Sequence, residues 1–138
     1  MKKLVVLLLA TLVATSAAAV VDPDPNMMGI YFDVNADNNC YTATPNVPFF
    51  AYAIVTNTTA AALDAHEFSY EMVVPVGSEG LLFRLASNIA NGAAQGVDVG
   101  TSGPLGGDHI VGLATPLPAA PAVIVHSWQY MLLGAFPV

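Results

Sequence analysis

The chain has 138 residues, of which 55% are hydrophobic and only 9% are charged. A chain of this length predicts one domain with a hydrophobic core of its own. Its three Lys and Arg residues are outnumbered by ten Asp and Glu, giving a net charge of −7 that disfavours phosphate backbones, so we expect no nucleic-acid partner.

Residues 1–19 predict a cleavable secretory signal peptide. Lys2 and Lys3 form its positive start, and the apolar stretch that follows, residues 4–13, is too short to cross a bilayer. Small residues then lead to a cleavage site predicted after Ala19; a cut one residue earlier fits nearly as well, and an uncleaved membrane anchor is the alternative. We therefore expect a secreted, periplasmic or cell-surface protein with no integral membrane segment after cleavage.

Cleavage leaves 119 residues in which Arg84 is the only Lys or Arg, so the net charge becomes −9. Cys40 is the only cysteine, which rules out an internal disulfide. We expect Cys40 to be buried as a small apolar residue, because no cation lies near it in the sequence to activate its thiol. The alternative is an intermolecular disulfide or a reactive thiol.

The predicted mature chain begins with a Pro-rich leader, residues 20–27, whose prolines drive the residues before them into extended geometry. A single domain is predicted over residues 28–138. Its first strand is predicted at 28–32, and a turn rich in Asp and Asn follows at 33–39. The next strand, 49–56, is apolar on both faces, as is typical of the centre of a sheet.

The middle of the chain contains the clearest alternation of apolar and polar residues. Residues 60–65 are compatible with a single helical turn, and residues 66–74 then predict a strand. One face of this strand is apolar and consists of Phe68, Tyr70, Met72 and Val74. Residues 81–85 predict a further strand, with Arg84 pointing outward.

The last third of the chain predicts three more strands. Residues 88–107 are rich in Gly, Ala and Ser and predict loops around one short strand at 97–99. Residues 109–114 predict a strand, 116–121 an extended connection and 122–133 the last strand. Six to eight short strands punctuated by Gly and Pro predict an all-β fold, an antiparallel β-sandwich. Either this fold closes at the last strand or the sequence is truncated at its C-terminus.

Three segments carry a resemblance to known proteins. Residues 50–57 (FAYAIVTN) end in a short Asn-bearing turn, and residues 67–71 (EFSYE) form an alternating strand. They resemble the cohesin-like and immunoglobulin-like β-sandwich modules of secreted bacterial proteins, which implies a binding module and, in true cohesins, a dockerin partner. Residues 29–33 (GIYFD) are similar to the start of small uncharacterised exported bacterial proteins, which implies no particular activity.

Asp33, Asn35 and Asp37 have the spacing of the first three oxygen ligands of a calcium-binding loop. The full motif also requires Gly at its sixth position and Glu at its twelfth, where this chain has Asn38 and Thr44. We therefore favour a polar turn, in which Asp and Asn are common, and keep calcium as the one cofactor that the pattern suggests.

Three histidines, His66, His109 and His126, are each predicted in a different strand. Three imidazoles are able to bind zinc together, but none of these is paired with another at short spacing, so we favour three separate sheet residues. Ser102 lies in a Gly-rich segment that faintly resembles the nucleophile segment of trypsin-like proteases. Because Ser102 follows His66 too closely for that fold and Thr101 replaces the expected acidic residue, we predict no catalytic residues.

His126, Trp128 and Tyr130 share one face of the last predicted strand. Such a row is able to stack on sugar rings or to pack against a partner, which makes it the candidate binding surface. Ser127 and Gln129 indicate that the opposite face is the solvent-exposed one. We therefore favour a position of the aromatic row in the sandwich core.

The sequence thus predicts an exported, non-enzymatic module with a structural or binding role. The alternative is a cohesin-like module that binds carbohydrate or protein, with a protein or glycan at the cell surface as its partner. A periplasmic hydrolase or metalloenzyme is the third class, and the sequence offers no coherent site for it.

Overall fold

The computed structural model describes residues 22–90 and 95–136, and the predicted signal peptide lies outside these ranges. Within them the chain forms eight strands: β1 (Met27–Tyr31), β2 (Pro48–Thr56), β3 (Ala62–Glu71), β4 (Leu82–Ile89), β5 (Gly96–Asp98), β6 (Thr101–Ser102), β7 (Gly106–Pro118) and β8 (Ala122–Leu132). The described ranges contain no α-helix. Nor do they contain a helix of the length and hydropathy that crossing a membrane requires.

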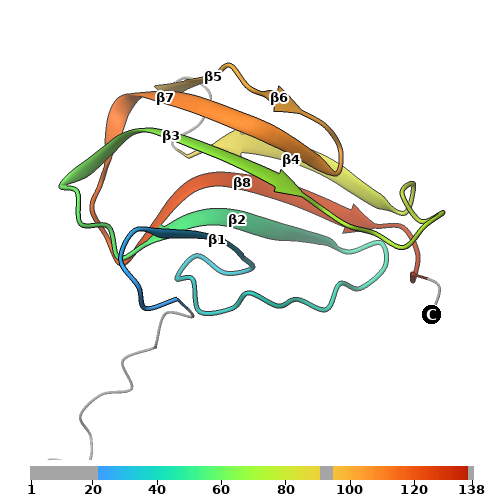
Figure 1. Ribbon diagram of the computed structural model, residues 1–138. Helices are drawn as coiled ribbons and strands as arrows, with labels where there is room; N and C mark the ends of the chain where they lie inside the picture. The colour runs from blue at the N-terminus through green and yellow to red at the C-terminus, as the bar shows by residue number, and fades with distance from the viewer. Residues whose placement is uncertain (1–21, 91–94, 137–138) are drawn as a thin grey trace, which may run out of the picture.

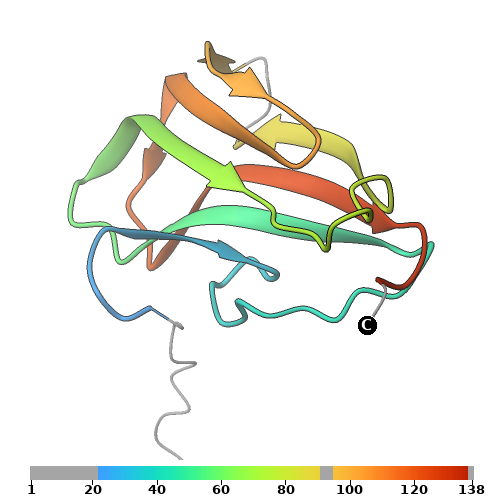
Figure 2. The ribbon, with the colours of Figure 1, turned by 45° about the vertical axis from the view of Figure 1, so that its right-hand side comes forward.

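The strands form two antiparallel sheets that lie face to face (Figures 1 and 2). One sheet has the order β1-β2-β8-β4, and the other has the order β3-β7-β5, with the short β6 also pairing with β7. Every strand pair is antiparallel. The predicted all-β antiparallel sandwich is therefore confirmed.

The main core lies between the sheets and is built from the inward-facing positions of each strand. Alternation along β2 buries small residues there, and β8 supplies the largest side chains. Its most buried members are Ala51, Ala53, Val55, Leu82, Leu117, Val123, Val125, Trp128, Tyr130 and Leu132. The predicted apolar face of β3 packs against this cluster through Phe68, Tyr70, Met72 and Val74.

A β-bulge changes which residues of β8 face the core. Ala53 pairs with His126, but the next residue, Ile54, pairs with Ile124. Val125 therefore has no pairing partner on β2. Before the bulge, the odd-numbered Val123 faces the core. After the bulge, the core-facing residues are even-numbered and include Trp128, Tyr130 and Leu132. Ile124 therefore lies on the opposite face of the sheet from Trp128, although simple alternation would place both even-numbered residues on one face.

A second, smaller cluster covers the outer face of the first sheet. Tyr31, Ala36 and Ile54 are buried there, and Ile124 packs against them. Ala36 reaches this position in a left-handed turn, with φ of 60°, and is fully buried. The turn after β1 thus folds back over the sheet instead of leaving it.

Cys40 lies in the same β1–β2 connection but is exposed, so the prediction of a buried cysteine is wrong. Its backbone N–H donates to Asn38 Oδ1 at 2.9 Å. The connection runs outside the sandwich, and alternation within strands says nothing about which of its residues are covered.

Strand boundaries differ from the prediction in several places. Residues 60–65 form no helical turn, because β3 already begins at Ala62, and this strand ends at Glu71 instead of residue 74. β4 continues to Ile89, and the first half of the predicted connection at 116–121 is strand, because β7 continues to Pro118. The β5 and β6 strands pair only with the first part of β7, so its prolines lie where one neighbour is absent and a missing N–H is tolerated.

Arg84 points between the sheets, so its predicted outward orientation is wrong. Its Nη1 donates to Tyr70 Oη at 3.1 Å and to Ser102 Oγ at 2.7 Å. Phe83 and Leu85 are the exposed residues of this edge strand instead, at 49% and 46%. The polar partners on the opposite sheet explain why the one cation takes the inner face.

Candidate functional site: an apolar cavity beside a histidine cluster

An apolar cavity of about 460 Å³ opens between the two sheets. Its walls come from β1, β2, β3, β4 and β8 and from the β1–β2 connection. The lining residues are Ile30, Phe32, Asn39, Tyr41, Ala43, Phe49, Ala51, Tyr70, Glu71, Met72, Leu82, Trp128, Tyr130, Leu132 and Phe136. Ligand pockets in proteins have volumes of roughly 300–1,000 Å³ and mostly apolar walls, and this cavity matches both properties.

A row of aromatic rings runs along the cavity from the surface to the interior. Phe32 stacks on Tyr41 at a centroid distance of 5.5 Å, and Tyr41 stacks on Phe49 at 5.0 Å. Phe49 in turn lies 6.0 Å from Tyr130. Tyr41 is 44% exposed whereas Tyr130 is 1% exposed, so the row connects solvent with the core.

The polar groups of the cavity carry little charge. Tyr130 Oη shares a hydrogen bond with Tyr70 Oη at 3.2 Å, and Tyr70 Oη also accepts from Arg84. Burial raises the pKa of Tyr130, and the hydrogen bond to Tyr70 adds to the effect, so the phenol stays neutral. Glu71 is the one ionisable carboxyl group in the lining, and no Lys, Arg or His belongs to it.

The predicted aromatic row of β8 is buried between the sheets. Trp128 and Tyr130 are each 1% exposed and His126 is 2% exposed, as the core interpretation expected. These three residues therefore present no exposed face on which a sugar ring could stack. Trp128 and Tyr130 line the cavity instead, while His126 lies beyond it among polar side chains.

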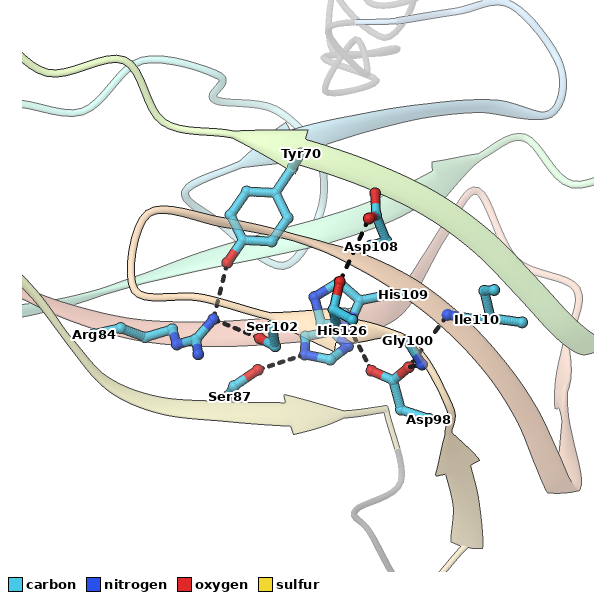
Figure 3. Close-up of polar contacts among 11 residues, drawn as sticks. Tyr70, Arg84, Ser87, Asp98, Gly100, Ser102, Asp108, His109, Ile110 and His126 are labelled. Atoms are coloured by element: carbon cyan, nitrogen blue, oxygen red, sulfur yellow. Dashed lines mark hydrogen bonds and ion pairs between the residues drawn. The ribbon is translucent and has the colours of Figure 1, made fainter.

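The histidine cluster occupies the interior next to the cavity (Figure 3). His109 on β7 and His126 on β8 come from opposite sheets, and their ring centroids lie 4.3 Å apart. His109 Nδ1 lies 2.5 Å from Asp98 Oδ2, and His126 Nε2 lies 2.8 Å from Ser87 Oγ. Four strands thus contribute to one polar cluster, whose two histidines are buried.

Burial keeps His126 neutral at neutral pH. Burial, together with a smaller effect of the neighbouring His109, lowers the pKa of His126 to about 4. Burial alone would raise the pKa of Asp98, but hydrogen bonds from His109, Gly100 and Ile110 bring it below its ordinary value. Asp98 is therefore a carboxylate at neutral pH, 21% exposed and held by three donors.

His66 joins the same region through Phe68. The His66 ring stacks on Phe68 at 5.8 Å, and Phe68 lies 4.9 Å from His109. Burial also lowers the pKa of His66. His109 and His126 therefore meet in the core, contrary to the preference for three separate histidines, whereas His66 is linked to His109 only through Phe68.

Asp98 and Ser87 are the residues of this cluster that sequence patterns did not single out. Ser87 lies between the predicted strand at 81–85 and the Gly-rich stretch, and Asp98 lies in the short strand predicted at 97–99 without any motif around it. A signal was nevertheless present on the histidines: His66 alternates in phase with Phe68, and His126 with Trp128. That phase places an imidazole on the inner face of each strand.

No serine-protease arrangement forms among the described residues. Ser102 accepts a hydrogen bond from Arg84. Ser87 bonds to His126, whereas Asp98 bonds to His109. The serine and the carboxylate therefore engage different imidazoles, and a Ser-His-Asp relay requires the same one.

The predicted calcium-binding segment is a turn closed on itself. Asp33 Oδ1 accepts from the backbone N–H of Asn35 at 2.8 Å and of Asp37 at 3.2 Å. One oxygen of the leading carboxylate is thus used by the turn, as an Asx-type turn requires. This geometry favours the polar-turn interpretation, and calcium at this turn stays a prediction.

No protein-family model matches the chain, and no curated protein or solved structure shows significant similarity to it. Its function is therefore inferred from the cavity and from the residues around it.

Proposed function

We propose that this protein is an exported, non-enzymatic binding module that holds a small, neutral, largely apolar molecule in the cavity between its sheets. The observation that carries the proposal is the aromatic row from Tyr41 to Tyr130, which lines an opening of about 460 Å³. Protein interiors are close-packed, with few voids larger than a water molecule, so a cavity of this size favours a ligand.

The lining selects the chemical class of the ligand. Stacked rings offer flat apolar faces, which favour a molecule that contains a planar or aromatic ring. An anion would meet Glu71 and no cation, and the acidic surface would repel it from a distance. A neutral apolar molecule is repelled neither by Glu71 nor by the acidic surface.

A carbohydrate or protein ligand is the second reading, which the cohesin-like resemblance supports. Carbohydrates need many hydrogen-bond partners, and the cavity offers few polar atoms beyond those of Asn39, Glu71 and the tyrosines. A protein partner would use the outer surface of the sandwich. The cavity therefore favours the small apolar ligand over both.

The proposal is tested with N-phenyl-1-naphthylamine, a neutral aromatic probe whose fluorescence rises in apolar surroundings. We expect saturable binding of one probe per chain. Ala43→Phe adds a ring to the cavity wall and should weaken binding by about ten-fold or more, because the ring occupies the ligand's volume.

Ala60→Phe is the matched control, because Ala60 is exposed and outside the cavity. It should bind the probe as the unmodified protein does. A linear, non-saturating fluorescence increase, or equal affinity in both variants, would show that the cavity is not a ligand site.

A further inference from the structure

The histidine cluster contains buried nitrogen atoms without hydrogen-bond partners. His109 and His126 are 1% and 2% exposed, yet His109 Nε2 and His126 Nδ1 have no partner among the described residues. Leaving a buried polar atom unsatisfied costs about 1–3 kcal/mol. Two such atoms on facing rings point to a ligand that accepts their lone pairs.

The other nitrogen of each ring is already engaged, which decides where those lone pairs lie. His109 Nδ1 bonds to the Asp98 carboxylate, which accepts only, so Nδ1 carries the proton and Nε2 the lone pair. His126 Nε2 shares a hydrogen bond with Ser87 Oγ, and in the tautomer in which the imidazole donates, Nδ1 carries the lone pair of that ring. Carboxylate-bound imidazoles of this kind are the usual ligands of zinc in proteins.

The three groups also lie close together. A ligand atom from each of Asp98, His109 and His126 lies within 4.8 Å of the other two. Because Asp98 bonds to Nδ1 of His109, an ion on the Nε2 lone pair lies on the far side of that ring, so the two facing imidazoles are the ligands and the carboxylate orients one of them. A dication would also compensate the Asp98 carboxylate, which otherwise has no cationic partner besides a histidine.

We propose that His109 and His126 bind a divalent transition-metal ion of the zinc class between the two sheets, with Asp98 orienting the His109 ring through its Nδ1–H. Imidazole nitrogen favours zinc, copper, nickel and cobalt over calcium and magnesium, which prefer oxygen alone. The partly exposed Asp98 on the edge strand β5 provides the route of entry. This site is separate from the apolar cavity and from the predicted calcium turn.

Untagged protein carrying Cys40→Ser, stripped of metal by EDTA and dialysed, is titrated with Zn²⁺ by calorimetry. The substitution removes the exposed thiol as a competing ligand. One Zn²⁺ per chain is expected, with Co²⁺ giving visible absorption bands of a nitrogen- and oxygen-coordinated ion. The absence of saturable binding of either ion would overturn the proposal.

Variants assign the ligands. His109→Gln should abolish measurable binding, and Asp98→Asn should weaken it by about 10- to 100-fold or more. Asp108→Asn is the matched control, because Asp108 is an exposed carboxylate next to His109 that bonds to Ser69 instead. Binding that survives His109→Gln would place the ion elsewhere and contradict the proposal.

A measurement on the protein without changes at the cluster keeps the test decisive if a histidine variant does not fold. Zn²⁺ should shift the ¹⁵N resonances of His109 Nε2 and His126 Nδ1, which direct coordination changes strongly. Unchanged resonances of both nitrogens at saturating Zn²⁺ would exclude these rings as ligands.

Discussion

At the scale of single residues, Arg84 is the most informative side chain. It is the only Lys or Arg after the predicted signal peptide, and it lies on the inner face of an edge strand. Its guanidinium joins β4 of one sheet to Tyr70 and Ser102 of the other (Figure 3). One cation thus links the two sheets beside the cavity.

Arg84→Met keeps the aliphatic stem but removes both hydrogen bonds. We expect a loss of about 1–2 kcal/mol in the free energy of unfolding, since bonds from a charged donor contribute more than neutral ones but this group is partly solvated. Urea denaturation measures the loss. Ser102→Ala removes one of the two acceptors and should cost less; equal stability of Arg84→Met and the unmodified protein would refute this role.

At the scale of elements, the leader and the β2–β3 turn hold each other in place. Asn57 follows β2 with φ of 48°, and its side-chain Nδ2 donates to Pro23 O at 2.9 Å. Asn26 Oδ1 accepts from the backbone N–H of Thr59 at 2.9 Å. The start of the described chain is therefore held against a turn that lies 33 or 34 residues later in the sequence.

Asn57→Ala and Asn57→Gly separate the contribution of the Asn57 side-chain hydrogen bonds from that of its left-handed backbone conformation. Both remove the side-chain hydrogen bonds, which costs about 1 kcal/mol, but only alanine must also adopt the left-handed conformation, at about 1–2 kcal/mol more. Chemical denaturation should therefore rank the glycine variant between the unmodified protein and the alanine variant. The reverse order would mean that backbone conformation is not what Asn57 provides.

Sequence patterns predict the strands well where a strand has one solvent-exposed face and one buried face. Residues 66–74 show this, because Phe68 and Tyr70 alternate with exposed polar residues and do face the core. The bulge at Val125 and the inward Arg84 left no such signal, since each depends on which strand lies opposite. The cavity was equally hidden, because Tyr41 stacks on Phe49 only after the β1–β2 connection folds back.

At the scale of the whole molecule, the interior of the sandwich is divided between two kinds of chemistry. The apolar cavity with its aromatic row lies beside a polar cluster of two histidines and an aspartate. Trp128 connects the two regions: its ring lies 4.5 Å from Tyr70 of the cavity and 4.7 Å from His126 of the cluster. Since Trp128 is the only tryptophan of the chain, its fluorescence reports on this boundary alone.

The most direct test of the proposed ligand site in the cavity excites Trp128 while N-phenyl-1-naphthylamine is added. Because Trp128 lines the cavity, energy transfer should quench its emission and sensitise the probe, saturating at one probe per chain. The same titration of Ala43→Phe should show little transfer at those concentrations. Trp128 emission that stays constant while the probe binds, or transfer that is equal in Ala43→Phe, would contradict a ligand site between the sheets.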